Sequence, residues 1–513
     1  MLCLLSAQFA AQGRVIRVPQ DAATIQAGLD SLLDTDTLLV DRGVYEERVV
    51  LPPFHLTMIG LYDPDGGEMS RPIVDLSNSA VPDSTAVLSV PRWSGPTIEN
   101  FRIIGGDRNG IRCWSTFLLL RNCVIDNCNE GFRQVQDSIG AVAEFENCYF
   151  RLNRNKCAIV RGGNELRAFR TVFEGGEGSS VMVSLSGSVL DSCIFTSGHQ
   201  RTLLYSARES IVTNCTFGPC DVPFAEAVLL GDSLVVFTGN RVTDIDYGTH
   251  AIKLMLDNPD AATVTGNTFV DCRGHAGGLM GAGALAVVFD PAHATQGPDI
   301  SQNIFGNNAG NSYCDDIAAR VDLRMRVQGN RFERGVLNGL PSVGGSTSPW
   351  QETPIVLRGN VFSDCGYALR GTAQTDARSN FWGDLSGPYH EFENPQGLGD
   401  TLSGPAQFVP WLTDTSSGAS GSVPQIADRI SFFSWPNPFN LATVIRFELS
   451  KSDRVELAVF NSLGQRVATL LNERMAAGVH RAEFSAAELA SGTYFCRLNA
   501  GEFASTMKMV LLK

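Results

Sequence analysis

One short phrase, repeated twelve times between Asn100 and Trp382, constrains this chain more than any other feature of its sequence. Most copies contain Cys or Asn, then any residue, then an aromatic or β-branched residue. The copies end at Ile103, Ile125, Phe150, Phe173, Phe195, Phe217, Val242, Phe269, Phe305, Phe332, Phe362 and Trp382. Successive copies are 20 to 36 residues apart. A recurrence of this length in a β-rich chain is typical of a solenoid.

Alternating apolar and polar residues precede each copy, as in Ile211–Phe217 and Ala262–Phe269, and alternation predicts short strands. Gly, Asn, Asp and Ser separate these runs and predict turns. A propeller blade needs more residues than one repeat provides, and the helix of a leucine-rich repeat is missing. We therefore expect parallel coils, with the phrase aromatics stacked inside and the Cys and Asn positions forming a ladder. This ladder changes from Cys to Asn at about Asn240.

With these repeats, residues 14–412 resemble the right-handed parallel β-helix, or pectin-lyase-like, superfamily. The resemblance implies an all-β fold, a solenoid of about 12–14 coils. Thr24–Leu33 has the spacing of an amphipathic helix, which would cap the first coil. The segment that contains Trp382 and Trp411 is similar to closing segments of bacterial extracellular β-helix proteins, and both side chains are expected to cover the last coil.

Four regions follow from the sequence: a residual signal peptide at 1–13, the β-helix at 14–412, a Ser/Gly-rich linker at 413–428 and a small domain at 429–513. Six alternating runs in the last region predict an Ig-like β-sandwich. Its opening Trp435–Asn440, its Phe460–Arg466 and its closing Lys508–Lys513 resemble the C-terminal sorting domain of type IX secretion cargo. The sandwich is also similar to the Ig-like domain of flagellar hook-capping proteins.

Charge and composition exclude some classes of binding partner. The formal charge of −14, without a basic stripe, argues against nucleic acid. Met1–Gly13 is too short to span a membrane, and no other transmembrane segment is evident. Of the 13 cysteines, several share one repeat position, which favours free buried thiols, and no Cys or His spacing indicates a zinc site. A monomer is expected.

Candidate catalytic residues come from counting back from each closing Phe, because the sequence signatures of methylesterases and lyases are missing. This counting predicts that Asp290, Asp315 and Asp316 stack on one edge of adjacent coils. Polygalacturonase-like hydrolases use three such aspartates, as general acid and as water activators. The residues expected to bind a substrate nearby are Arg273, His275 and His293. Ordinary turn aspartates, or a Ca²⁺ site built from their oxygens, are the alternatives, and no other cofactor is expected.

These observations favour a secreted protein on the surface of a bacterium with an outer membrane, exported by a type IX-like system through its C-terminal domain. Its partners would be that secretion machinery and a polysaccharide or cell-surface glycan. A glycan-binding or structural, adhesive role is the main interpretation. The alternative is a glycoside hydrolase or polysaccharide lyase acting on uronic-acid-type polymers, so whether the protein is an enzyme stays open.

Overall fold

The computed structural model describes residues 13–415 and 432–511, apart from short gaps between strands. The larger gaps are 64–69, 78–85, 136–140, 176–181, 197–202, 257–261, 275–282, 290–297, 309–316, 334–340 and 346–354. The chain divides into two compact units, of which the first holds most residues up to Gly421 and the second holds Ser422–Lys513. Each unit is described by itself.

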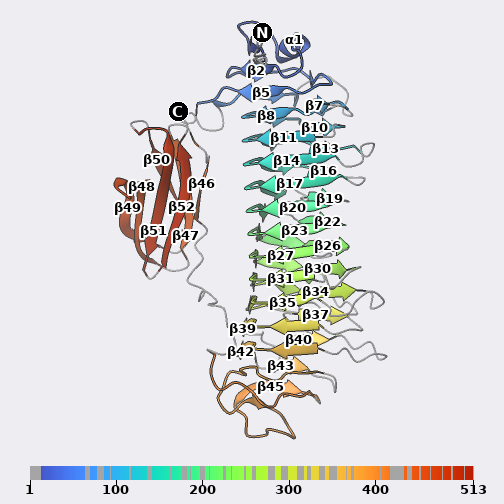
Figure 1. Ribbon diagram of the computed structural model, residues 1–513, viewed down its shortest axis with the longest axis vertical. Helices are drawn as coiled ribbons and strands as arrows, with labels where there is room; N and C mark the ends of the chain where they lie inside the picture. The colour runs from blue at the N-terminus through green and yellow to red at the C-terminus, as the bar shows by residue number, and fades with distance from the viewer. Residues whose placement is uncertain are drawn as a thin grey trace, which may run out of the picture. The chain divides into compact units, whose positions relative to one another are not determined.

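The first unit is a parallel β-solenoid (Figure 1). In the described residues each typical coil adds one strand to sheet A, then one to sheet B, then one to sheet C, and these sheets hold 14, 13 and 15 strands. Equivalent strands of successive coils pair in parallel, as Phe150 with Phe173 and Phe173 with Phe195. The predicted all-β parallel solenoid is confirmed.

Sheet A contains the alternating runs that precede each phrase. Its strands are β1 (Val15–Val18), β2 (Thr37–Val40), β5 (Thr57–Gly60), β8 (Thr97–Glu99), β11 (Phe117–Arg121), β14 (Val142–Glu146), β17 (Glu165–Phe169), β20 (Ser188–Asp191), β23 (Ser210–Thr213), β27 (Val235–Thr238), β31 (Ala262–Thr265), β35 (Asp299–Ser301), β38 (Met325–Gln328) and β41 (Ile355–Arg358). Alternate side chains point into the solenoid, as Val212, Phe237 and Val264 do.

Sheet B contains the ends of the phrases. Its strands are β3 (Val44–Tyr45), β6 (Ile73–Asp75), β9 (Arg102–Ile104), β12 (Val124–Asp126), β15 (Tyr149–Asn153), β18 (Val172–Gly175), β21 (Ile194–Thr196), β24 (Thr216–Phe217), β28 (Arg241–Thr243), β32 (Thr268–Val270), β36 (Ile304–Gly306), β39 (Arg331–Glu333) and β42 (Val361–Ser363).

Sheet C closes each coil. Its strands are β4 (Val49–Val50), β7 (Ala86–Val90), β10 (Asn109–Cys113), β13 (Glu130–Gln134), β16 (Lys156–Val160), β19 (Met182–Ser184), β22 (Leu204–Ser206), β26 (Val228–Asp232), β30 (His250–Leu256), β34 (Gly283–Phe289), β37 (Ile317–Arg320), β40 (Pro341–Gly345), β43 (Tyr367–Arg370), β44 (Pro388–Tyr389) and β45 (Gly399–Ser403). A small sheet D beside it holds β25 (Cys220–Val222), β29 (Ile245–Tyr247) and β33 (Arg273–Gly274).

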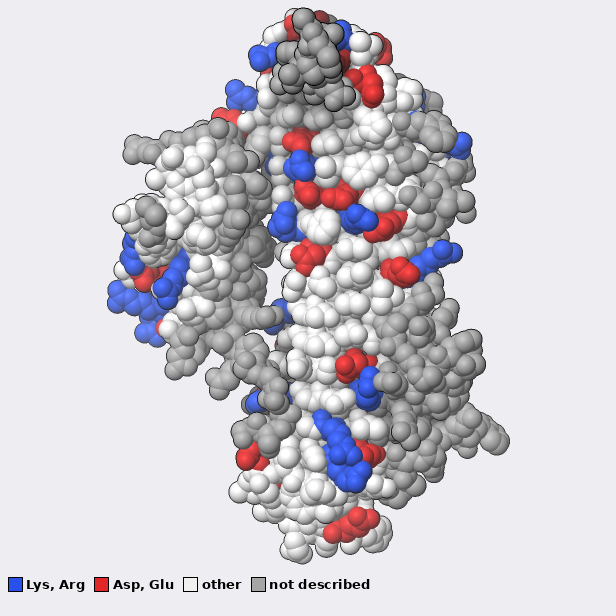
Figure 2. Space-filling view, in the orientation of Figure 1, with Lys and Arg blue, Asp and Glu red and all other residues white. Residues whose placement is uncertain are grey.

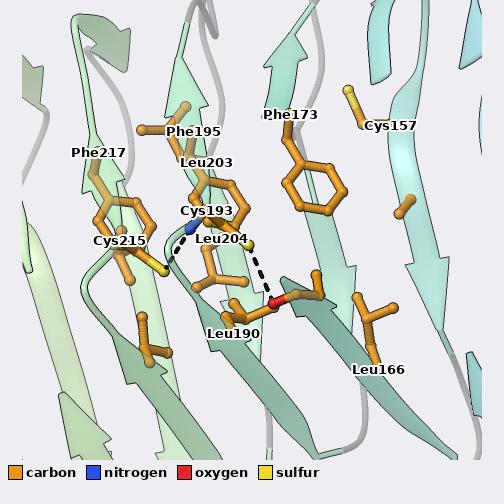
Figure 3. Packing of buried hydrophobic residues seen from close by; sticks show 14 of the residues in the cluster. Cys157, Leu166, Phe173, Leu190, Cys193, Phe195, Leu203, Leu204, Cys215 and Phe217 are labelled. Carbon is orange, nitrogen blue, oxygen red and sulfur yellow. Dashed lines mark hydrogen bonds between the residues drawn. The ribbon is translucent and has the colours of Figure 1, made fainter. Parts of the chain in front are cut away.

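The phrase aromatics form the predicted stack inside the coils (Figure 3). Phe173 and Phe195 have ring centroids 5.0 Å apart, and the stack ends with Trp382 on Phe362 at 4.8 Å. Where the phrase has Val242 instead of an aromatic residue, Phe237 from sheet A fills the space, 5.9 Å from Phe217. A side chain from sheet A therefore occupies the place in the stack where the repeat lacks an aromatic residue.

The Cys and Asn ladder lies in the turn from sheet A to sheet B. Asn267 Nδ2 donates to Asn303 Oδ1 at 2.9 Å, and the same oxygen accepts from the Asn267 backbone N–H. Each Asn from Asn240 to Asn380 bonds to its neighbour in this way. At the Cys positions the thiol of Cys193 donates to the Ala168 carbonyl oxygen of the preceding coil.

The N-terminal cap is a short helix. The predicted helix over Thr24–Leu33 is observed as α1, which is confined to Ile25–Asp30. The Glu47 carboxylate accepts from the N–H groups of Ile25 and Gln26 at 2.7 and 2.9 Å, which satisfies the exposed donors at the helix start.

The second unit is a small antiparallel β-sandwich, as expected. One sheet holds β46 (Phe432–Trp435), β47 (Ala442–Leu449) and β50 (Gly478–Ser485). The other has the order β49 (Arg466–Met475), β48 (Asp453–Asn461), β51 (Gly492–Ala500) and β52 (Phe503–Leu511). Phe447, Leu457 and Leu498 are fully buried between them. The strand β46 was not among the six predicted.

Candidate functional site

Of the six residues predicted to form a site, the structure describes Arg273. It lies on β33 with its side chain exposed. Asp290, Asp315, Asp316, His275 and His293 lie outside the described residues. The predicted catalytic and binding roles of all six remain predictions.

Charged positions from three adjacent coils line up in sheet D. Arg273 pairs in register with Asp246 of β29, and Asp246 pairs with Asp221 of β25. The strand β33 lies against β30 and β34 of sheet C, and β30 carries the half-exposed Lys253. Arg273 in register with Asp246 suits a polar substrate contact and equally a surface charge network.

The strands next to the predicted aspartates enter and leave sheet C at opposite ends. Leu285 of β34 pairs with Ile317, the first residue of β37, whereas β34 continues to Phe289. The chain therefore leaves sheet C just before Asp290 and enters it just after Asp316. Counting back from the closing Phe could not detect this, because both corners of the coil vary in length.

The outer face of sheet A carries a different candidate site, which we call the uncharged strip. Alternation along β20, β23, β27 and β31 turns seven half-exposed, uncharged side chains outward. They are Val189, Ile211, Thr213, Val236, Thr238, Thr263 and Thr265. Register aligns them in two rows, and neighbouring coils are about 4.8 Å apart. Figure 2 shows this face without Lys, Arg, Asp or Glu over its middle coils.

Charged side chains on the same face flank the uncharged strip, and many of them form ion pairs. On the N-terminal side Arg121 contacts Glu99 at 2.6 Å and Glu146 at 2.7 Å. On the C-terminal side Asp376 accepts from Arg378 and Arg358. The hydrogen bond from Arg378, followed by that from Arg358, holds the pKa of the Asp376 carboxyl far below its usual range. These ion pairs neutralise one another. Asp191, in register with Thr213 at the edge of the strip, instead accepts from the neutral Thr213 hydroxyl and Asn214 amide, so the strip has a carboxylate at one end.

Hydroxyl groups give the uncharged strip its polar chemistry. Thr265 Oγ1 lies 3.2 Å from Ser301 Oγ of the next coil, and Thr213 Oγ1 donates to Asp191 Oδ1 at 2.8 Å. A threonine hydroxyl can both donate and accept, while its methyl group offers apolar contact. The strip can therefore bind a surface rich in hydroxyl groups, but its seven side chains include no acid, base or activated nucleophile.

Sequence reasoning missed this strip, although a signal for it exists. The residue two positions before each Cys or Asn of the ladder points outward from sheet A. From β8 to β41 these residues are Glu99, Arg121, Glu146, Phe169, Asp191, Thr213, Thr238, Thr265, Ser301, Gln328 and Arg358. The run of hydroxyl residues in this row could have been found before the structure was known.

Both tryptophans of the closing segment cover the last coils, as expected. Trp382 is fully buried on Phe362. Trp411 packs over Gly387, where a Cβ atom would lie 2.4 Å from the ring, and its Nε1 donates to the Leu385 carbonyl oxygen. Burial in the core leaves Trp382 no ring face for a sugar.

No set of three or more His, Cys, Asp or Glu side chains in the described residues is arranged to hold a metal ion. Within the same residues, no helix has the length and apolar character needed to cross a membrane.

Comparisons with known proteins agree with the two units. Residues 160–314 match the family described as right handed beta helix region, and residues 434–512 match the secretion system C-terminal sorting domain. No curated protein matches the chain. A similar solved structure is a double mutant of the tailspike protein of E. coli bacteriophage HK620. The two chains are 10% identical with a TM-score of 0.30, over 93% of this chain and 87% of the tailspike chain.

The three parallel sheets and the family match over residues 160–314 define a right-handed parallel β-helix protein. More particularly, it is a β-helix protein that carries a C-terminal sorting domain, which indicates secretion by the type IX system to the cell surface or the extracellular space.

Proposed function

We propose that this secreted protein binds glycans through the outer face of its solenoid, and that the uncharged strip is the contact surface. The observation that supports this is the arrangement of the strip: two rows of hydroxyl and aliphatic side chains at a regular coil spacing, between paired charges. We also infer that the domain limits are 14–412 for the β-helix, 413–428 for the linker and 429–513 for the sorting domain.

The chemistry of the uncharged strip favours a neutral polysaccharide. Sugar hydroxyls can exchange hydrogen bonds with Thr238 and Thr265, and the C–H faces of sugar rings can pack on Ile211 and Val236. Acidic polymers would gain little there, because Arg167, in register with Val189 of the strip, already contacts Glu165 at 2.8 Å, and Asp191 adds a carboxylate at the edge. A glycan-binding or adhesive role therefore suits this face better than the cleavage of uronic-acid-type polymers.

The test is binding of the full chain to a panel of neutral and acidic polysaccharides. We expect Thr238→Arg to weaken binding to neutral polymers at least tenfold, because it places an unpaired charge in the uncharged strip. Thr268→Arg is the matched control, since Thr268 is also half-exposed but lies on sheet B. Equal binding by both variants and the unmodified protein would remove the strip from consideration.

The same panel of polysaccharides tests whether the protein is instead a polysaccharide-degrading enzyme. Release of reducing ends or unsaturated products, abolished by Asp316→Asn, would assign a polysaccharide-degrading activity to the predicted aspartates. Binding without product formation supports the glycan-binding proposal. If the protein neither binds these polysaccharides nor releases products from them, both proposed functions are contradicted.

A further inference from the structure

The four-stranded sheet of the sorting domain presents a basic face to its outside. Val455 and Leu457 of β48 are buried, so alternation turns Arg454 outward. Register brings the other members to the same side: Arg474 lies opposite Arg454, Arg466 opposite Phe460 and Arg497 opposite Ala458. We call Arg454, Arg466, Arg474 and Arg497 the basic face. Figure 2 shows Lys and Arg gathered on this domain.

The charges of the basic face are poorly compensated. Glu456 is the outward carboxylate of these strands among the described residues, and it pairs with Arg466 at 2.7 Å. Arg454 and Arg497 donate instead to the neutral amide oxygens of Asn472 and Asn499, both at 3.2 Å. Arg454 and Arg474 are directly opposite each other, an arrangement that costs stability in a sheet. An external anion would remove that cost.

The basic face does not follow from overall composition. Residues 434–512 hold eight Lys or Arg and seven Asp or Glu, which gives +1 in a chain of formal charge −14. The other sheet of the sandwich also has an opposed pair, Arg446 and Arg481. By position, however, that sheet also carries Glu448 and Glu483, each two residues from one of these arginines along its strand.

Aromatic rings lie among these cations. Phe460 and Phe495 are opposite each other on the basic face, Phe495 is 36% exposed, and Arg466 sits 5.5 Å above the Phe460 ring. Exposed aromatic rings beside Arg and Lys are the combination that favours the boundary between headgroups and acyl chains. A flat sheet also fits a flat surface on which negative charges repeat. An acidic protein would instead need carboxylates placed to match each cation of the sheet.

We propose that the basic face binds a membrane surface that bears anionic phosphate headgroups. This inference is independent of the proposed glycan binding, because it concerns a different unit. The cations would contact phosphate oxygens, and the two phenylalanines would enter the headgroup boundary.

The experiment measures binding of the full chain to vesicles of phosphatidylglycerol and phosphatidylcholine, with pure phosphatidylcholine as the neutral reference. Each basic residue near an anionic surface strengthens binding roughly fivefold. We therefore expect Arg454→Gln/Arg474→Gln to weaken binding to the anionic vesicles about 25-fold. The control Arg446→Gln/Arg481→Gln removes the same charge from the other sheet and should change binding much less.

A charge-preserving variant distinguishes an effect of charge from an effect of misfolding. Arg454→Lys/Arg474→Lys should keep vesicle binding, and raised salt should weaken it in every variant that binds. The proposal is overturned if the unmodified protein binds both vesicle types equally or neither, or if the two Gln pairs weaken binding equally. Retention on immobilised poly-glutamate without vesicle binding would also overturn it, in favour of an acidic protein partner.

Discussion

Single residues of the ladder satisfy the backbone where sheet A turns into sheet B. Asn303 Oδ1 accepts from the backbone N–H and the side chain of Asn267, while its Nδ2 donates to Asn330 Oδ1 and to the Val264 carbonyl oxygen at 2.8 Å. One fully buried side chain thus serves three coils, and the same pattern repeats along the polar part of the ladder.

We expect Asn303→Ala to lower the free energy of unfolding by about 3–5 kcal/mol, because it leaves the Asn267 N–H and the Val264 carbonyl without partners in the core. Asn307→Gly is the control, since Asn307 is exposed and its φ of 50° suits glycine. Urea unfolding of both variants measures the difference, and a cost below about 1 kcal/mol for Asn303→Ala would contradict this account.

Buried thiols should make the protein sensitive to alkali and inert to thiol reagents. Burial raises the pKa of Cys157 and of Cys496 to about 12, and it raises the pKa of Cys215 well above its usual value. A folded-state pKa above the unfolded value means that stability is complete below about pH 8.5 and falls as pH rises toward 12.

Each such thiol should contribute a loss of roughly 1.4 kcal/mol per pH unit across that window. Thermal unfolding between pH 7 and pH 11 measures the trend. A thiol-reactive dye at pH 8 should label these three cysteines only after denaturation, and rapid labelling of the native protein would show that they are accessible.

At the scale of elements, the turn from sheet A to sheet B depends on one left-handed residue. The residue before each ladder position has φ between 49° and 68° in all twelve copies: Asn100, Asn122, Asn147, Arg170, Ser192, Asn214, Gly239, Gly266, Gln302, Gly329, Gly359 and Ser379. Asn and Gly tolerate this conformation best, which explains their frequency here. This single dihedral lets two strands meet at a sharp corner.

Gly266 isolates the backbone effect, because an added Cβ would meet no atom within 4 Å. We expect Gly266→Val to cost about 1–2 kcal/mol from the left-handed backbone alone. Gly266→Asn should cost clearly less, because Asn adopts this region readily. Chemical denaturation compares the two, and equal costs would show that something other than φ controls the turn.

For the whole solenoid, each coil is stabilised mainly by its two neighbours, so damage at one end should stay local. Trp382 covers the aromatic stack at the C-terminal end of the solenoid. We expect Trp382→Ala to remove about 3–5 kcal/mol locally. Faster amide hydrogen exchange in β41–β45, with unchanged exchange in β8–β23, would confirm it. Phe392→Ala, in the same segment but 81% exposed, should change neither region.

The repeat alone was enough to predict the solenoid, the aromatic stack and the Asn ladder. Stacked coils place equivalent residues next to each other, so a period in sequence becomes a contact in space. The sorting domain was also recognisable, because its turns and alternating strands are local signals. Where a local gap is filled by another sheet, as Phe237 replaces the aromatic missing at Val242, only the tertiary structure could reveal the solution.

The candidate sites depended more on the fold than on the sequence. The corners between sheets B, C and A differ in length from coil to coil, so residue counting does not establish which aspartates face each other across them. The uncharged strip and the basic face needed strand register, because their members lie on strands of successive coils or on neighbouring strands of one sheet. Side-chain alternation predicts the side of a strand, but pairing between strands decides which side chains form one surface.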